Sequence, residues 1–196
     1  MKNEVIIKSI MCLLLGYKKL KDSKKDIESL SYLLGQSIRQ YDIPKENFHI
    51  SEGAKKRWEE LSDDKIENYW YHKRVKCNKL KSSKSYLFYK GSENKGIETV
   101  LNPGDFFTFR NMFHEEHIIP VSLIKDKMIN NTNSVTESTI RELLDSMHMC
   151  IILKEEDRDI NHNLGKTANR TDDFKKNVEN IYDKRGIILL PYEQFP

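Results

Sequence analysis

Apolar side chains recur every three or four residues in the first third of the chain, the spacing of one face of an amphipathic helix. The pattern predicts helices over residues 4–20 and 24–40, and Pro44 ends the second because proline disfavours a helical predecessor. A third helix is expected from near Gly53. A fourth is expected from a polar cap with acids in its first turn. The residues of this fourth helix are its cap Ser62-Asp63-Asp64 and the inward-facing Ile66, Trp70, Cys77 and Leu80.

The pattern changes after Ser82, where short β-prone runs alternate with turn residues. These runs predict a small sheet from 86–89, 97–101 and 106–109. A capping box, Ser134-x-x-Glu137, predicts the start of a further helix. The remaining expected elements are a strand at 114–122, a strand at 149–153, a polar helix at 155–161, a helix at 172–185 ended by Gly186, and a strand at 187–190.

These elements predict an α+β fold, with a mostly helical N-terminal region followed by a small sheet and a strand–strand–helix module. The expected division is a helical and mixed region over 1–112, the strand–strand–helix module over 113–170, and a C-terminal helix and strand over 171–196.

Composition narrows the classes of protein that fit. The chain has 196 residues, of which 38% are hydrophobic and 32% charged, as in ordinary globular proteins. No apolar run approaches the roughly 20 residues that span a bilayer, so no membrane partner is expected. The apolar stretch 5–15 is interrupted by Lys8, which favours a buried helix over a signal peptide. Three scattered cysteines without a C-x-x-C pair favour a cytoplasmic location and give no reason to expect structural zinc.

The net charge of +3 conceals an asymmetry along the chain. Residues 1–90 carry an excess of eight positive charges, and residues 91–196 an excess of five negative charges. Residues 68–92 contain no acidic side chain and interleave aromatic with basic ones, which suits contact with phosphates. A lysine-coated helix with aromatic residues in the core explains the pattern equally well. The candidate DNA-binding residues are Lys73, Arg74, Lys76, Lys79, Lys81, Lys84 and, further along, Lys166.

Two short stretches carry the candidate chemistry. The first is His114-Glu115-Glu116-His117-Ile118-Ile119-Pro120-Val121-Ser122, and the second is Glu155-Glu156-Asp157-Arg158-Asp159-Ile160-Asn161. Hydrolysis of a phosphodiester needs a nucleophilic water, a base for its proton and positive charge on the leaving oxygen. Strand, strand and helix in that order can bring Glu116, His117 and Asn161 around one divalent cation.

Glu116-His117-Ile118-Ile119-Pro120-Val121-Ser122 resembles the acid-His-Ile-x-Pro-x-Ser signature of the HNH (ββα-metal) nuclease family. The resemblance covers 114–166 and is specific in its first half. It implies that His117 is the general base and that Glu116 and Asn161 are metal ligands. It also implies Mg²⁺ as the cofactor, with Mn²⁺ as a substitute. The chain departs from the family in using glutamate, where aspartate is usual, and in the long spacer 123–147.

Other residues stay open for the same site. The helix ligand could instead be Asp157, Asp159 or Asn163. His114 could support the site or lie at the surface. His148 occupies roughly the place of the family's middle asparagine, although a structural role is the simpler interpretation.

The resulting hypothesis is a metal-dependent endonuclease that cuts double-stranded DNA and leaves 5′-phosphate and 3′-hydroxyl ends. A type II restriction enzyme acting as a homodimer, without a nucleotide cofactor, is the leading specific role. The alternatives are a nonspecific HNH nuclease (a toxin or defence effector), an RNA-directed nuclease, and a DNA-binding protein whose HNH fold is inactive.

Overall fold

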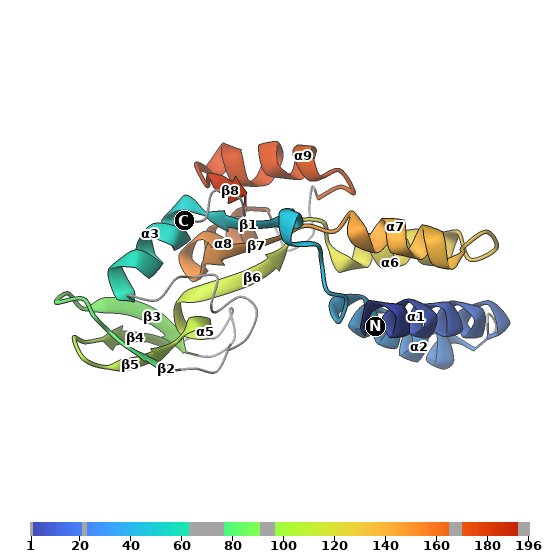
Figure 1. Ribbon diagram of the computed structural model, residues 1–196, viewed down its shortest axis with the longest axis horizontal. Helices are drawn as coiled ribbons and strands as arrows, with labels where there is room; N and C mark the ends of the chain where they lie inside the picture. The colour runs from blue at the N-terminus through green and yellow to red at the C-terminus, as the bar shows by residue number, and fades with distance from the viewer. Residues whose placement is uncertain (1, 21–22, 63–76, 91–96, 165–169, 192–196) are drawn as a thin grey trace. The chain divides into compact units, whose positions relative to one another are not determined.

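The computed structural model describes residues 2–20, 23–62, 77–90, 97–164 and 170–191 (Figure 1). Its internal contacts divide the chain into two compact units, each assembled from three separate segments. The helical unit comprises 1–48, 117–149 and 170–177, and the sheet unit comprises 49–116, 150–169 and 178–196. This division differs from the predicted succession of 1–112, 113–170 and 171–196, because the chain passes repeatedly between the units.

The helical unit packs four amphipathic helices together (Figure 1). Its elements are α1 (Lys2–Lys19), α2 (Lys24–Arg39), α6 (Val121–Asn130), α7 (Glu137–Asp145) and the short α9 (Phe174–Asn177). The α1 helix contacts α2, α6 and α7, and its inner face buries Ile6, Ile7, Ile10 and Leu14. Tyr41 Oη donates a hydrogen bond of 2.5 Å to Asp145 Oδ1, which ties the segment after α2 to the end of α7.

The sheet unit is built around a four-stranded sheet with the order β6-β7-β1-β8. Two antiparallel pairs, β2–β5 and β3–β4, form separate two-stranded sheets. The strands are β1 (Phe48–Ser51), β2 (Cys77–Lys79), β3 (Tyr86–Lys90), β4 (Ile97–Leu101), β5 (Phe106–Thr108), β6 (Phe113–His117), β7 (Met149–Leu153) and β8 (Leu189–Pro191). The helical elements are α3 (Glu52–Leu61), α5 (Phe109–Met112), α8 (Lys154–Leu164), a π-helical turn at Val178–Tyr182 and a 3-10 turn at Asp183–Arg185.

An aromatic cluster forms part of the core of the sheet unit. The Trp58 ring of α3 lies 5.7 Å from the Phe113 ring and 6.1 Å from the Phe109 ring, measured between centroids. Phe113 is the first residue of β6 and is buried. Burial of such large rings is among the strongest apolar contributions that a domain of this size can gain, so the start of β6 is firmly anchored.

The structure confirms the predicted α+β class, and most expected elements are present. The predicted strand 114–122 is wrong in its second half, since β6 ends at His117 and Pro120 precedes the first residue of α6. Proline suits this place because the first N–H groups of a helix have no intrahelical partner. The helix expected from Ser134 begins after the N-cap Thr136, which forms a capping box with Thr139.

Three other expectations have different outcomes. The predicted helix 172–185 is three short pieces, although Gly186 does follow the last of them with a φ of +68°. Cys77 lies in β2 and not in a helix, and most of the helix expected after Ser62 falls outside the described residues. Within the described part of the chain, no helix combines the length and the apolar character needed to cross a membrane.

His148 makes the stability of the helical unit depend on pH. Its ring stacks on Phe174 with a centroid distance of 3.9 Å and an interplanar angle of 17°. Burial lowers the pKa of His148 from 6.5 to about 4, because the charged imidazolium loses hydration in this position.

The lowered pKa predicts acid destabilisation. Between pH 6.5 and 4 the unfolded chain binds more protons at His148 than the folded chain does, so stability is highest above pH 6.5 and falls toward pH 4. At pH 5 the loss is up to about 2 kcal/mol, reduced by the partial exposure of the ring. Urea unfolding at several pH values would measure it. His148→Gln should flatten the profile in this range, and an unchanged slope in that variant would contradict the assignment.

Candidate metal centre

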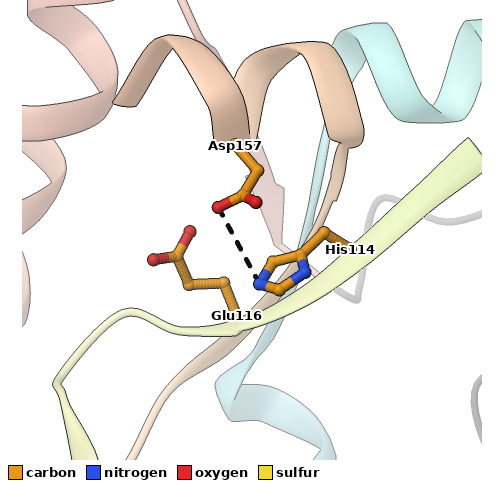
Figure 2. Close-up of side chains that lie close together, drawn as sticks. All are labelled: His114, Glu116 and Asp157. Atoms are coloured by element: carbon orange, nitrogen blue, oxygen red, sulfur yellow. Dashed lines mark ion pairs between the residues drawn. The ribbon is translucent and has the colours of Figure 1, made fainter. Parts of the chain in front are cut away.

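Strand β6 places two of the predicted residues on one face. Side chains alternate along a strand, so His114 and Glu116 project to one side and Glu115 and His117 to the other. For Glu116 and His117 to act on one metal and its water, the start of the strand would have to be irregular or wrapped by the helix, and β6 is a continuous strand over Phe113–His117. The face that carries His114 and Glu116 is the face that meets α8 (Figure 2).

The first turn of α8 is fixed by a half-buried glutamate, Glu156. Glu156 Oε2 accepts hydrogen bonds from the Leu153 N–H at 2.8 Å and from Ser51 Oγ at 2.6 Å. Ser51 is also the N-cap of α3, where its Oγ accepts from the Ala54 N–H at 2.9 Å. One carboxylate thus ties together the N-termini of two helices, and burial raises its pKa. A Cβ on Gly53 would lie 2.6 Å from Glu156 Oε1, so glycine permits this close approach.

Asp157, in the first turn of α8, lies beside strand β6. The side chains of His114, Glu116 and Asp157 point toward one another (Figure 2), and one potential ligand atom from each lies within 4.8 Å of the others. His114 Nε2 is 3.8 Å from Asp157 Oδ1. Asp157 is 2% exposed, and His114 and Glu116 are half-buried. The cluster therefore combines one imidazole and two carboxylates in a place largely removed from water.

Electrostatics favour a cation in this cluster. Two carboxylates at about 5 Å repel each other by about 3 kcal/mol at the effective dielectric constant of a protein. A divalent metal ion offsets that repulsion, and the positive end of the helix dipole also stabilises the acids in the first turn of α8. One nitrogen and two carboxylate donors form a set that divalent cations accept. The residues present therefore fit a divalent metal ion.

Asn161 lies one turn beyond Asp157. Its Nδ2 donates a hydrogen bond of 2.7 Å to Asp157 Oδ1, which orients that carboxylate toward the strand. The structure thus brings Asp157, an alternative helix ligand in the sequence hypothesis, into the cluster, with Asn161 behind it. Direct ligation by the Asn161 amide oxygen stays a prediction.

The other two alternatives on the helix are placed as follows. Asp159 Oδ2 forms an ion pair with Arg185 Nη1 at 2.7 Å. The side chain of Asn163 lies outside the described part of the structure.

Two residues that the sequence did not single out hold the main chain directly after Glu116. The buried Arg170 donates from Nη1 to the His117 carbonyl at 3.0 Å. Asn177, which is fully buried, donates from Nδ2 to the Ile118 carbonyl at 3.0 Å. The Ile118 N–H donates to the His148 carbonyl at 2.9 Å. His148 thus supports this turn through its backbone, while its ring packs on Phe174.

Part of the predicted DNA-binding set lies on the two-stranded sheet β2–β5. Lys79 of β2 is directly opposite Phe106 of β5, whose side chain is 68% exposed. Lys81 and Lys84 are also exposed. The structure does not describe Lys73, Arg74, Lys76 and Lys166, so their predicted role falls outside the described residues.

A scan against models of protein families, a search of curated proteins and a search of solved structures each found no match to this chain.

The hydrogen bond from Asn161 predicts a graded effect on metal binding. Asn161→Ala should weaken Mn²⁺ binding by about 10- to 100-fold, the usual effect of removing a residue that orients a ligand. Asp157→Asn should weaken it further, because this change removes a carboxylate ligand. Calorimetric titration would measure both. Arg185→Ala, which breaks the ion pair to Asp159 on the same helix, is the control and should bind normally. Equal effects in the Asn161 and Asp157 variants would identify Asn161 as a ligand in its own right.

Proposed function

We propose that this protein is a divalent-metal-dependent DNA endonuclease that hydrolyses phosphodiester bonds. The observation that carries the proposal is the convergence of His114, Glu116 and Asp157 from β6 and α8. Directly after Glu116 in the sequence comes His117, the residue to which the HNH resemblance assigns the role of base. The strands β6 and β7 and the helix α8 occur along the chain in the order that the resemblance implies, with α6 and α7 between the two strands, and this order supports the same class of enzyme.

Each step of the proposed hydrolysis has a candidate group. A water oxygen attacks phosphorus while His117 accepts the water proton on a ring nitrogen, which suits an imidazole near neutral pH. The bond from phosphorus to the 3′ oxygen breaks, and that oxygen takes a proton from solvent, which leaves 5′-phosphate and 3′-hydroxyl ends. Glu116 and Asp157 would hold the divalent metal, with His114 as a third donor. The metal, when bound, supplies positive charge to the phosphate and the leaving oxygen.

The proposed substrate is double-stranded DNA. Lys79, Lys81 and Lys84 are exposed, and Phe106 lies opposite the first of them as an exposed aromatic surface. Lysines of this kind contact phosphates, and an aromatic ring beside them can pack on sugars or bases. We further propose a type II restriction enzyme acting as a homodimer, since a two-fold dimer matches cleavage of both strands at a symmetric site. A nonspecific nuclease and a DNA-binding protein with an inactive HNH fold are the competing possibilities.

Plasmid cleavage tests the enzyme proposal. With Mn²⁺ or Mg²⁺ the wild-type protein should convert supercoiled plasmid to linear DNA, and a chelator should stop the reaction. Glu116→Gln, Asp157→Asn and His117→Ala should each lower the rate by about 100-fold or more, because each removes a ligand or the base.

The matched control is Glu155→Gln, which removes a carboxylate that pairs with Arg57 at the surface beside the same turn of α8. This variant should cut at the wild-type rate. Discrete bands would support a restriction enzyme, and a smear would indicate a nonspecific nuclease. Cleavage that is no faster in the wild type than in the Asp157 and His117 variants would refute the enzyme proposal and favour an inactive fold.

Salt dependence tests the DNA surface. Replacing Lys79, Lys81 and Lys84 with alanine should weaken binding to duplex DNA. The slope of log affinity against log salt should fall by about 0.9 for each phosphate that these lysines neutralise in the wild-type complex. Fluorescence anisotropy in Ca²⁺, which suppresses cleavage in many nucleases, would measure it. The control replaces Lys18, Lys19 and Lys25, three exposed lysines of the helical unit. Equal slopes in the two triple variants would contradict a specific role for the first surface.

A further inference from the structure

We infer that His114 makes this metal centre a mixed nitrogen–oxygen site that selects a first-row transition ion, of the Mn²⁺ to Zn²⁺ type, over Mg²⁺. The inference deepens the proposed function and rests on its metal centre, but it does not require nuclease activity. The sequence resemblance implies Mg²⁺ with oxygen ligands from Glu116 and Asn161. The structure instead brings an imidazole into the cluster, from a position just before the family signature.

The orientation of His114 carries the argument. His114 lies on the same face of β6 as Glu116, because one residue separates the two and side chains alternate along a strand. Its Nε2 lies 3.8 Å from Asp157 Oδ1, too far for a direct hydrogen bond but close enough for both atoms to reach one ion of about 2.1 Å bond length. Figure 2 shows the ring and the two carboxylates directed at a common point between strand and helix.

The chemistry of the donors determines the preferred ion. Mg²⁺ takes oxygen ligands, demands nearly octahedral geometry and retains several waters. Imidazole nitrogen suits zinc, iron, nickel and copper, and affinity for a given nitrogen-containing site rises from Mn²⁺ toward Cu²⁺. One imidazole ligand therefore raises the affinity of the site for a transition ion more than it raises the affinity for Mg²⁺. Mn²⁺ also suits the site, because the other two ligands are carboxylates.

The surrounding contacts hold the donors in place. Asp157 is oriented by Asn161, and the first turn of α8 is fixed by the bonds of Glu156 to Ser51 and Leu153. On the strand side, the residue before His114 is Phe113, which is buried and packs on Trp58 in the aromatic cluster. Ligands on a helix and a strand, supported in this way, preserve a preformed geometry better than ligands on loops do. A preformed site discriminates between ions by donor type and geometry.

Metal binding by the full chain, freed of metal by a chelator, tests the inference. Calorimetric titration should show one Mn²⁺, Co²⁺ or Zn²⁺ per chain, bound at least about tenfold more tightly than Mg²⁺. His114→Asn should weaken binding of the transition ions by more than about tenfold and change Mg²⁺ affinity by less than about threefold. With Mn²⁺ bound, pulsed electron paramagnetic resonance should show coupling to an imidazole nitrogen in the wild type and none in His114→Asn.

Two controls separate ligation from folding. His148→Asn removes a histidine of the helical unit and should keep the imidazole coupling and the affinity. His114→Gln provides a second variant of different shape. Thermal unfolding without metal, followed for all three variants, identifies any that fail to fold, and the conclusion is drawn from those that do.

The outcomes distinguish this inference from the proposed function. Selective binding that depends on His114, without DNA cleavage, would support the metal assignment and refute the nuclease. Equal affinity for Mg²⁺ and Mn²⁺, unaffected by His114→Asn, would overturn the selectivity and leave the nuclease proposal standing. If no ion binds to the wild type, both the inference and the proposed metal centre fail.

Discussion

The starts of two helices in the sheet unit depend on the bonding of one half-buried carboxylate, Glu156. Its Oε2 accepts from the N–H of Leu153, the residue directly before its own helix, and from Oγ of Ser51, the residue that caps α3. Burial of a carboxylate is unfavourable unless its oxygens are hydrogen-bonded, so the two helices must start at the same place. Asp157 is the next residue along the helix, and this constraint therefore also directs it at the strand that carries His114 and Glu116.

The sequence predicted the parts of the site that depend on local pattern. The alternation of β6 and the acidic start of α8 follow from residues close together in the chain, so the place of Glu116 on a strand and the helix after 149–153 were both predictable. The sequence could not determine which helix residue reaches the strand. Asp157 and Asn161 lie one turn apart on the same face, and the choice between them depends on how far α8 advances over the sheet.

Contacts between segments far apart in the chain could not be predicted from the sequence either. Asn177 reaches a carbonyl 59 residues away, and Arg170 one that is 53 residues away. Neither residue belongs to a periodic pattern, and a single polar residue near a turn has many possible roles. The same reasoning applies to Pro120. In the sequence it extends a β-prone run, whereas the packing of α6 with α1 and α2 favours a helix that begins directly after it.

The alternation of β6 also limits how Glu116 and His117 can share one reaction. Side chains on opposite faces of a strand cannot ligate the same ion without a distortion of the backbone. His117 is the last residue of the strand, and Arg170 and Asn177 hold the carbonyls of His117 and Ile118. This geometry allows His114, Glu116 and Asp157 to hold one ion together. His117 lies on the other face of the strand, so the role of base stays a prediction that needs the water and the phosphate to reach the end of β6.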